Sequence, residues 1–342
     1  MSRTSGASLV PEGVVVSTRV RFARNVRGRA FPGALDAGER AAVATQLRRA
    51  TRRLPIECGA PYAVHDLEHD GLAEVARVAR DRWMPVPGDG DMAGRWLFRD
   101  HRGIVSILVN DEDHARVQAG GDGWCPDRLV EAALPVADAL EQEVGFATDP
   151  RWGYLTASPG NLGSGFRVSA LVHLPALAWS GELPAMVEAA RTLDTAVRGI
   201  DGEGSAVSGD LLQVSNAVAF GRPLGGIVDR VAALVDRLVE AEGTALERLR
   251  RSESASIGSR LERERIGLVS SRRMGRREAL DFLSVRRLAG LVGAIEREDE
   301  RRFGESVREV LADRTTDAEL RAAWLRSRMW IDPSGAVPPP LR

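Results

Sequence analysis

The residues with the clearest chemical potential lie in the segment 155–177. Residues 158–165 read Ser-Pro-Gly-Asn-Leu-Gly-Ser-Gly, and glycines at this density allow a turn that brings the backbone close to a ligand. Apolar and polar residues then alternate from Phe166 to Leu174, which is typical of a strand with one buried face. Arg167 therefore lies on a strand beside a tight loop, where its guanidinium group could bind an anion.

Another pair of arginines lies near the start of the chain. Residues 14–24 read as a strand that enters a turn, and in an extended strand Arg19 and Arg21 point to the same face. On its own this pattern is typical of a solvated strand face. We expect such a solvated surface for the three arginines that follow, Arg24, Arg27 and Arg29.

A third segment joins an apolar strand to a group of polar residues. The β-branched run 104–110 leads into Asn-Asp-Glu-Asp-His-Ala-Arg at 110–116. The end of such a strand is a usual place for a functional site. Alternatively, Glu112 and Arg116 form an i,i+4 ion pair that opens a helix and contributes about a few tenths of a kcal/mol.

The fourth segment is rich in glycine. Residues 196–205 read Ala-Val-Arg-Gly-Ile-Asp-Gly-Glu-Gly-Ser and precede a strand-like run at 211–216. The glycines permit a loop that closes over a ligand, and the loop supplies Arg198 and Glu203. A glycine-rich surface hairpin is the alternative.

The composition restricts the ways in which this chain could bind a nucleotide. The chain has 342 residues, and its 47 basic residues other than histidine are all arginines, against 48 acids. Without lysine it can form no Walker-A loop, no strand lysine of a eukaryotic-type protein kinase and no Schiff base. Arginines would have to bind the phosphates. The near-zero net charge gives no indication of binding to nucleic acid or an anionic membrane.

Cysteines and histidines give little indication of a metal site. Cys58 and Cys125 lie far apart, which fits a reducing cytoplasm and excludes a disulfide framework. No apolar run approaches the length of a membrane span. His65 and His69, with Glu68 between them, could place two metal ligands on one helix face. No third ligand is evident, so we expect an ordinary surface helix turn.

In order and residue type, these segments resemble the ATP:guanido phosphotransferases, or phosphagen kinases. That family's glycine loop reads Cys-Pro-x-Asn-Leu-Gly-Thr-Gly-x-Arg, its first strand Ser-Ser-Arg-x-Arg-Leu-Ala-Arg-Asn and its acidic segment Asn-Glu-Glu-Asp-His-x-Arg. The chain matches them at 158–167, 17–25 and 110–116, with Ser158 in place of the reactive cysteine and Asp111 in place of a glutamate.

Other features favour the bacterial protein arginine kinase branch. They are Gly-Glu-Gly-Ser at 202–205, Val-His-Leu-Pro-Ala-Leu at 172–177 and a first strand that starts by residue 14 without the helical domain of small-molecule phosphagen kinases. Some members carry a phosphoarginine-sensing Arg-Asp-x-x-Arg-Ala motif. The nearest segment here, 317–322, lacks its leading arginine and has one residue too many before Arg321.

The resemblance implies an α+β fold, with a largely antiparallel sheet flanked by helices and a small helical C-terminal part. It divides the chain into a flexible N-terminus at 1–12, a catalytic domain at 13–250, a helical part at 251–331 and a disordered tail at 332–342. Capping signals and apolar spacing predict helices at 36–53, 71–81, 128–144, 183–192 and 226–250, with a loop at 85–94.

The resemblance also implies a role for each motif residue. It assigns contacts with the ATP phosphates to Ser17, Arg19, Arg21, Arg116, Arg167 and Arg198, and it assigns the acceptor guanidinium to Glu112, Glu203 and Ser158. Asn161, Gly163 and Gly165 form the loop, and His173 lies near the nucleotide. Mg²⁺ is held through the phosphates, without a protein ligand.

Ser158 changes the expected chemistry. A serine hydroxyl stays neutral near pH 7, where a cysteine could be a thiolate beside the guanidinium, so we expect reduced turnover or a shifted acceptor preference. A serine-hydrolase function is excluded because Thr156 replaces the first glycine of Gly-x-Ser-x-Gly and Pro159 follows the serine.

Three functions stay open. The first is a cytoplasmic, ATP- and Mg²⁺-dependent kinase of exposed arginines in proteins, with a Clp protease or chaperone system as partner, a homodimer left open, and neither nucleic acid nor membrane involved. The second is a kinase of free arginine or another small guanidino compound. The third is a low-activity or inactive relative that senses nucleotide or arginine.

Overall fold

A computed structural model describes residues 13–70, 92–190, 194–200, 207–312 and 318–329. The expected helix at 71–81, most of the loop at 85–94, Glu203 and both chain ends lie outside the described residues.

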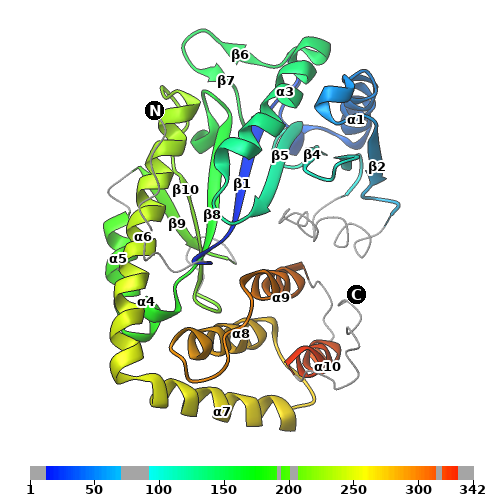
Figure 1. Cartoon of the computed structure of the whole chain (residues 1–342). Helices are drawn as coiled ribbons and strands as arrows, with labels where there is room; N and C mark the ends of the chain where they lie inside the picture. The colour runs from blue at the N-terminus through cyan, green and yellow to red at the C-terminus, as the bar shows by residue number, and fades with distance from the viewer. Residues whose placement is uncertain (1–12, 71–91, 191–193, 201–206, 313–317, 330–342) are drawn as a thin grey trace.

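The centre of the molecule is an eight-stranded antiparallel sheet in the order β2-β3-β4-β5-β1-β8-β10-β9 (Figure 1). Its strands are β1 (Val15–Arg24), β2 (Tyr62–Asp66), β3 (Trp96–Asp100), β4 (Val105–Val109), β5 (Ala115–Asp122), β8 (Phe166–His173), β9 (Thr195–Gly199) and β10 (Leu211–Asn216). A separate hairpin pairs β6 (Thr148–Asp149) with β7 (Gly153–Tyr154). The α+β fold expected from the sequence is confirmed.

Helices cover one face of this sheet and extend beyond one of its ends (Figure 1). The helices on the sheet side are α1 (Ala37–Thr51), α3 (Pro126–Val144), α4 (Pro175–Trp179), α5 (Leu183–Ala190) and α6 (Leu224–Ser252). The helices below the sheet in Figure 1 are α7 (Ser254–Ser270), α8 (Arg276–Leu291), α9 (Glu300–Ala312) and α10 (Ala318–Met329). The boundary expected at residue 250 stays a prediction.

Strand alternation explains why the sheet has one apolar and one polar face. On β1 the side chains of Val20 and Phe22 are fully buried, and the ring of Phe22 lies 5.0 Å from that of Phe166 on β8. Helix α3 packs on β1 and β5, and α6 packs on β8 and β10. The intervening residues, which include Arg19 and Arg21, therefore point to the opposite face.

One alternative and one expectation for the local structure are wrong. Residues 110–114 connect β4 to β5 as a hairpin turn and open no helix. His65 lies in β2, paired with Leu97 of β3, and His69 lies in the turn that follows, so the expected surface helix turn is absent there. In both places pairing with a neighbouring strand decides the local structure, and the i,i+4 spacing does not.

The predicted start of α1 is confirmed and gives a stability test. Asp36 Oδ1 accepts a hydrogen bond from Glu39 N at 2.8 Å, and Glu39 Oε2 accepts one from Asp36 N at 3.1 Å. Asp36→Ala should lower the free energy of unfolding by about 1 kcal/mol, because a helix N–H loses its acceptor. Urea denaturation measures this, and Glu131→Ala on the exposed side of α3 should cost less than about 0.5 kcal/mol. Equal losses in both variants would contradict the prediction.

Candidate active site

Four arginines, which we call the arginine cluster, meet on the polar face of the sheet. They are Arg19 and Arg21 of β1, Arg116 of β5 and Arg167 of β8. Arg21 is directly opposite Arg167, and Arg19 is opposite Ser169. Arg116 is opposite Ala23, two residues along from Arg21. Paired residues of antiparallel strands share a face with Cβ atoms about 5 Å apart, so the register gathers these guanidinium groups.

The cluster is electrostatically strained by its own charges. Burial lowers the pKa of Arg19 to about 9, and the charges of Arg116 and Arg167 add to this effect. Burial also lowers the pKa of Arg21 well below its usual value, helped by Arg19, Arg116 and Arg167, whereas the carboxylate of Glu112 raises it. The buried Nε atoms of Arg19, Arg21 and Arg116 have no hydrogen-bond partner among the described residues. Such a group of cations is suited to bind a polyanion.

The turn from β4 to β5 places an acidic group beside the cluster. Asp111 pairs with Arg116 at 2.8 Å and with Arg95 at 3.6 Å. Glu112 is exposed, whereas its neighbours Asp113 and His114 are buried. The Glu112 carboxylate is thus available to a ligand on a turn that its neighbours fix.

Hydrogen bonds to the residues that directly follow β1 hold the turn between β4 and β5 in place. Asp113 Oδ1 accepts from Asn25 Nδ2 at 2.6 Å and from Ala157 N at 2.8 Å. His114 Nδ1 accepts from Val26 N at 3.0 Å. Burial raises the pKa of Asp113 and lowers that of His114 to about 4, so the imidazole is neutral near pH 7 and can accept at Nδ1.

Ser158 lies half-buried at the start of the glycine loop, just before a short 3₁₀ turn, Pro159–Asn161. The hydroxyl of Thr156 donates to the Ser158 carbonyl at 2.8 Å. Gly163 has φ +102°, and a Cβ there would lie 2.8 Å from Cα of Phe220. Glycine is therefore required both by the left-handed backbone and by the close approach of this chain segment.

Ser17 and Arg198, the other residues expected to contact the phosphates, lie on the same face of the sheet, farther from the centre of the arginine cluster. Arg167 donates from Nη2 to Ser215 Oγ at 3.1 Å. Arg198 of β9 is opposite Gln213, which is opposite Leu171, which in turn is opposite the buried Ser17. Ser17 and Arg198 thus share the face of the arginine cluster, with Arg198 at the edge strand.

His173 lies at the other end of β8, six residues or about 20 Å along the strand from Arg167. It is 1% exposed; its Nε2 lies 2.8 Å from Ser284 Oγ, and its Nδ1 lies 2.8 Å from Nη1 of Arg287. Burial lowers its pKa well below the usual value. The structure places this imidazole against α8, and its expected place near the nucleotide stays a prediction.

Sequence reasoning missed some residues around the site. Arg24 is 3% exposed, so its expected solvated position is wrong, whereas Arg27 and Arg29 are exposed as expected. The sequence alone indicates no role for Asn25 or Arg95. Their contacts come from residues far away in the chain, and the only local signal was that Arg24 and Asn25 directly follow the Arg-x-Arg strand.

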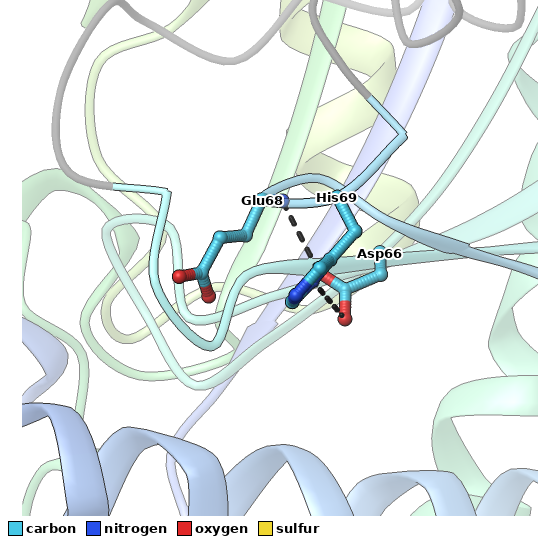
Figure 2. Close-up of side chains that lie close together, drawn as sticks. All are labelled: Asp66, Glu68 and His69. Atoms are coloured by element: carbon cyan, nitrogen blue, oxygen red, sulfur yellow. Dashed lines mark hydrogen bonds and ion pairs between the residues drawn. The ribbon is translucent and has the colours of Figure 1, made fainter.

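A possible metal-binding group lies outside the cluster. Asp66, Glu68 and His69 offer ligand atoms within 4.8 Å of one another, as Figure 2 shows. Asp66 accepts from Glu68 N at 3.1 Å and lies 3.1 Å from His69 Nδ1, and this contact raises the pKa of His69. Glu68 and His69 are exposed, and nothing else in the described chain points to a bound ion there.

None of the described helices is both long and apolar enough to cross a membrane.

Comparison with known proteins defines the class to which this fold and site belong. Residues 89–245 match the ATP:guanido phosphotransferase C-terminal catalytic domain. A protein-arginine kinase of Moorella thermoacetica is 36% identical over 300 residues, which cover 84% of this chain and 83% of the relative. One of Caldanaerobacter subterraneus is 30% identical over 284 residues, which cover 82% and 84%. The chain therefore belongs to the ATP:guanido phosphotransferase family.

Solved structures support the fold. Lombricine kinase is 25% identical with a TM-score of 0.58, covering 68% of this chain and 67% of that one. A duplicated taurocyamine kinase from Schistosoma mansoni, solved with components of a transition-state analogue, is 24% identical with a TM-score of 0.61, covering 76% and 38%.

Proposed function

We propose that this protein transfers the γ-phosphoryl group of ATP to the guanidinium group of arginine side chains in proteins. The arginine cluster beside the exposed carboxylate of Glu112 carries this proposal, because it offers a triphosphate site and a guanidinium site on one face. The family membership and the protein-arginine kinase relatives support both the reaction class and the protein acceptor.

On the donor side, the cluster would neutralise the phosphate oxygens. Phosphoryl transfer passes through a loose transition state whose equatorial oxygens stay anionic, so positioned cations supply most of the catalysis. Arg19, Arg21 and Arg167 each offer planar, multiply donating groups suited to phosphate. Ser17, Arg116 and Arg198 would complete the contacts, with the loop of Asn161, Gly163 and Gly165 alongside.

On the acceptor side, the difficulty is that a guanidinium is cationic and a poor nucleophile. Glu112, together with Glu203, would orient it and accept a proton as the N–P bond forms. The bond between the γ-phosphorus and the β,γ-bridging oxygen breaks, and ADP leaves with that electron pair. The products are phosphoarginine and ADP.

Mg²⁺ would be held through the phosphate oxygens and water, without a protein ligand, because the nearby carboxylate of Glu112 is assigned to the acceptor guanidinium. When bound, the ion would neutralise part of the negative charge that develops on the phosphate groups. Asp111 is already paired with Arg116 and Arg95, so we assign it first to holding those arginines.

Ser158→Cys should raise turnover several-fold, because a thiolate beside the acceptor adds one charge interaction of about 1 kcal/mol or more. The gain should appear as pH rises through the thiol pKa, ordinarily about 8.5, since only the ionised form contributes. Steady-state rates between pH 6 and 9 measure this. A Ser158→Cys profile that matches the wild type at every pH would show that this position carries no charge-dependent role.

The direct test is to incubate the protein with ATP, Mg²⁺ and an unfolded protein, and to detect phosphoarginine by mass spectrometry without acid treatment. A parallel ADP-release assay with free arginine and other guanidino compounds separates a small-molecule kinase from a protein kinase. ATP binding without any phosphorylated acceptor would favour the sensor function, which the neutral side chain of Ser158 makes a second candidate.

The finer assignments are part of the same proposal. A cytoplasmic location and a Clp protease or chaperone system as partner are part of the proposal through the resemblance to protein arginine kinases, and the oligomeric state, with a homodimer as one alternative, stays open. Purifying the wild type and the phosphorylation-defective Glu112→Gln variant from cells, and identifying the proteins that co-purify with each, would test the Clp protease or chaperone system as partner.

A further inference from the structure

Arg24 is a buried cation at the end of the strand that carries Arg19 and Arg21. Its guanidinium carbon lies 3.6 Å from the centroid of the Tyr154 ring. Its Nη1 donates to Ala23 O at 2.8 Å and to Ser164 O at 3.1 Å. A cation this deeply buried is costly, so its contacts indicate a purpose beyond surface solvation.

The turn 163–165, whose Ser164 carbonyl accepts from Arg24, is also joined to β1 and to Tyr154 through its backbone. Ala23 N donates to Gly165 O at 2.8 Å, and Tyr154 and Gly163 exchange both backbone hydrogen bonds at 2.7 and 3.2 Å. A Cβ at Gly165 would lie 2.4 Å from Nη1 of Arg24, so glycine leaves the space that the guanidinium occupies. This turn leads directly into Arg167.

Asn25 connects the end of β1 in a similar way to the turn 110–114, which carries Glu112. Its Nδ2 donates to Asp113 Oδ1 at 2.6 Å and to Leu155 O at 3.0 Å, and its Oδ1 accepts from His114 N at 2.9 Å. Asp113 in turn accepts from Ala157 N, the residue before Ser158. One side chain thus joins β1, the turn that carries Glu112 and the segment that enters the glycine loop.

We propose that Arg24 and Asn25 form one positioning element that sets the two sides of the active site relative to each other. Arg24 fixes the turn before Arg167, on the phosphate side. Asn25 fixes Glu112 relative to Ser158, on the acceptor side. Neither touches the reacting atoms. This inference rests on the proposed function for the assignment of the two sides.

The two residues should therefore have separable kinetic effects. Arg24→Met leaves the loop without its cation, and we expect the Kd for ATP to rise about tenfold or more, because small displacements of binding groups are costly. Arg24→Lys should recover part of this loss, since an ammonium can lie over the Tyr154 ring and donate to Ser164 O. Asn25→Ala should lower kcat about tenfold or more and change the Kd for ATP by less than about twofold.

The experiment measures the Kd for ATP by equilibrium binding, and kcat and KM by phosphoarginine formation, with rates corrected for folded protein by circular dichroism. Arg27→Met is the matched control, because this nearby arginine is exposed and its side chain donates from Nε to the backbone oxygen of Phe146. If Arg24→Met does not fold, Tyr154→Leu removes the ring contact and Tyr154→Phe preserves it.

Loss of ATP affinity in Arg24→Met with partial recovery in Arg24→Lys would support the proposal. It is overturned if Arg24→Met matches Arg27→Met per folded molecule, or if Asn25→Ala changes only the folded fraction. Absence of phosphoarginine in the wild type would count against the proposed function, while the ATP affinities would still decide the role of Arg24.

Discussion

Glu112→Gln should reduce arginine phosphorylation by about 10²- to 10⁴-fold, the usual contribution of a positioned general base. Glutamine keeps the size of the side chain but can neither pair with a guanidinium nor take its proton. The turn should survive, because Asp113 and His114, which hold it to Asn25 and Val26, are unchanged.

The affinity for ATP, unlike the phosphorylation rate, should not decrease in the Glu112→Gln variant. The Glu112 carboxylate raises the pKa of Arg21, so it lies close to the arginine cluster, and its removal takes one negative charge from beside the site where the phosphates would bind. We therefore expect the Kd for ATP to stay the same or to fall slightly, as equilibrium binding would show.

Glu131→Gln is a suitable control, because this exposed acid lies on α3, which packs on the opposite face of the sheet. It should leave both binding and rate unchanged. If Glu112→Gln retained more than about a tenth of the wild-type rate, Glu112 would not be the acceptor carboxylate.

The strands of the site could be predicted because their alternation is local. Val20 and Phe22 alternate with Arg19 and Arg21, and the same period appears from Phe166 to Leu174. The pairing of Arg21 with Arg167 is different, since these residues are far apart in the chain and only the register of β1 with β8 brings them together. The resemblance to a known family supplied that link; the periodicity alone could not.

The errors have the same origin. Arg24 looked like a surface residue because nothing near it in sequence covers it, and the ring that does so belongs to Tyr154. His65 looked helical because its spacing from His69 is i,i+4, yet pairing with Leu97 makes its segment a strand. In each case a distant partner overrides a local pattern.

The arginine cluster should lower the stability of the ATP-free protein, because its cations repel one another. Arg21→Met should weaken ATP binding by about 100-fold, because charge-assisted hydrogen bonds to phosphate contribute about 1.5–3 kcal/mol each. The same change should raise the free energy of unfolding of the ATP-free protein by about 1 kcal/mol, since it removes a half-buried cation next to Arg19, Arg116 and Arg167. Methionine is long and unbranched enough to fill the space.

Urea denaturation with and without ATP separates these effects. The variant should be the more stable protein without nucleotide, and the order should reverse at saturating ATP, because a ligand stabilises only the form that binds it. Arg27→Met, an exposed arginine on the continuation of β1, should shift neither quantity. A variant that loses stability without ATP yet binds ATP normally would mean that Arg21 is a structural cation. The depression of its pKa would then reflect packing against the other arginines, with no phosphate site at this position.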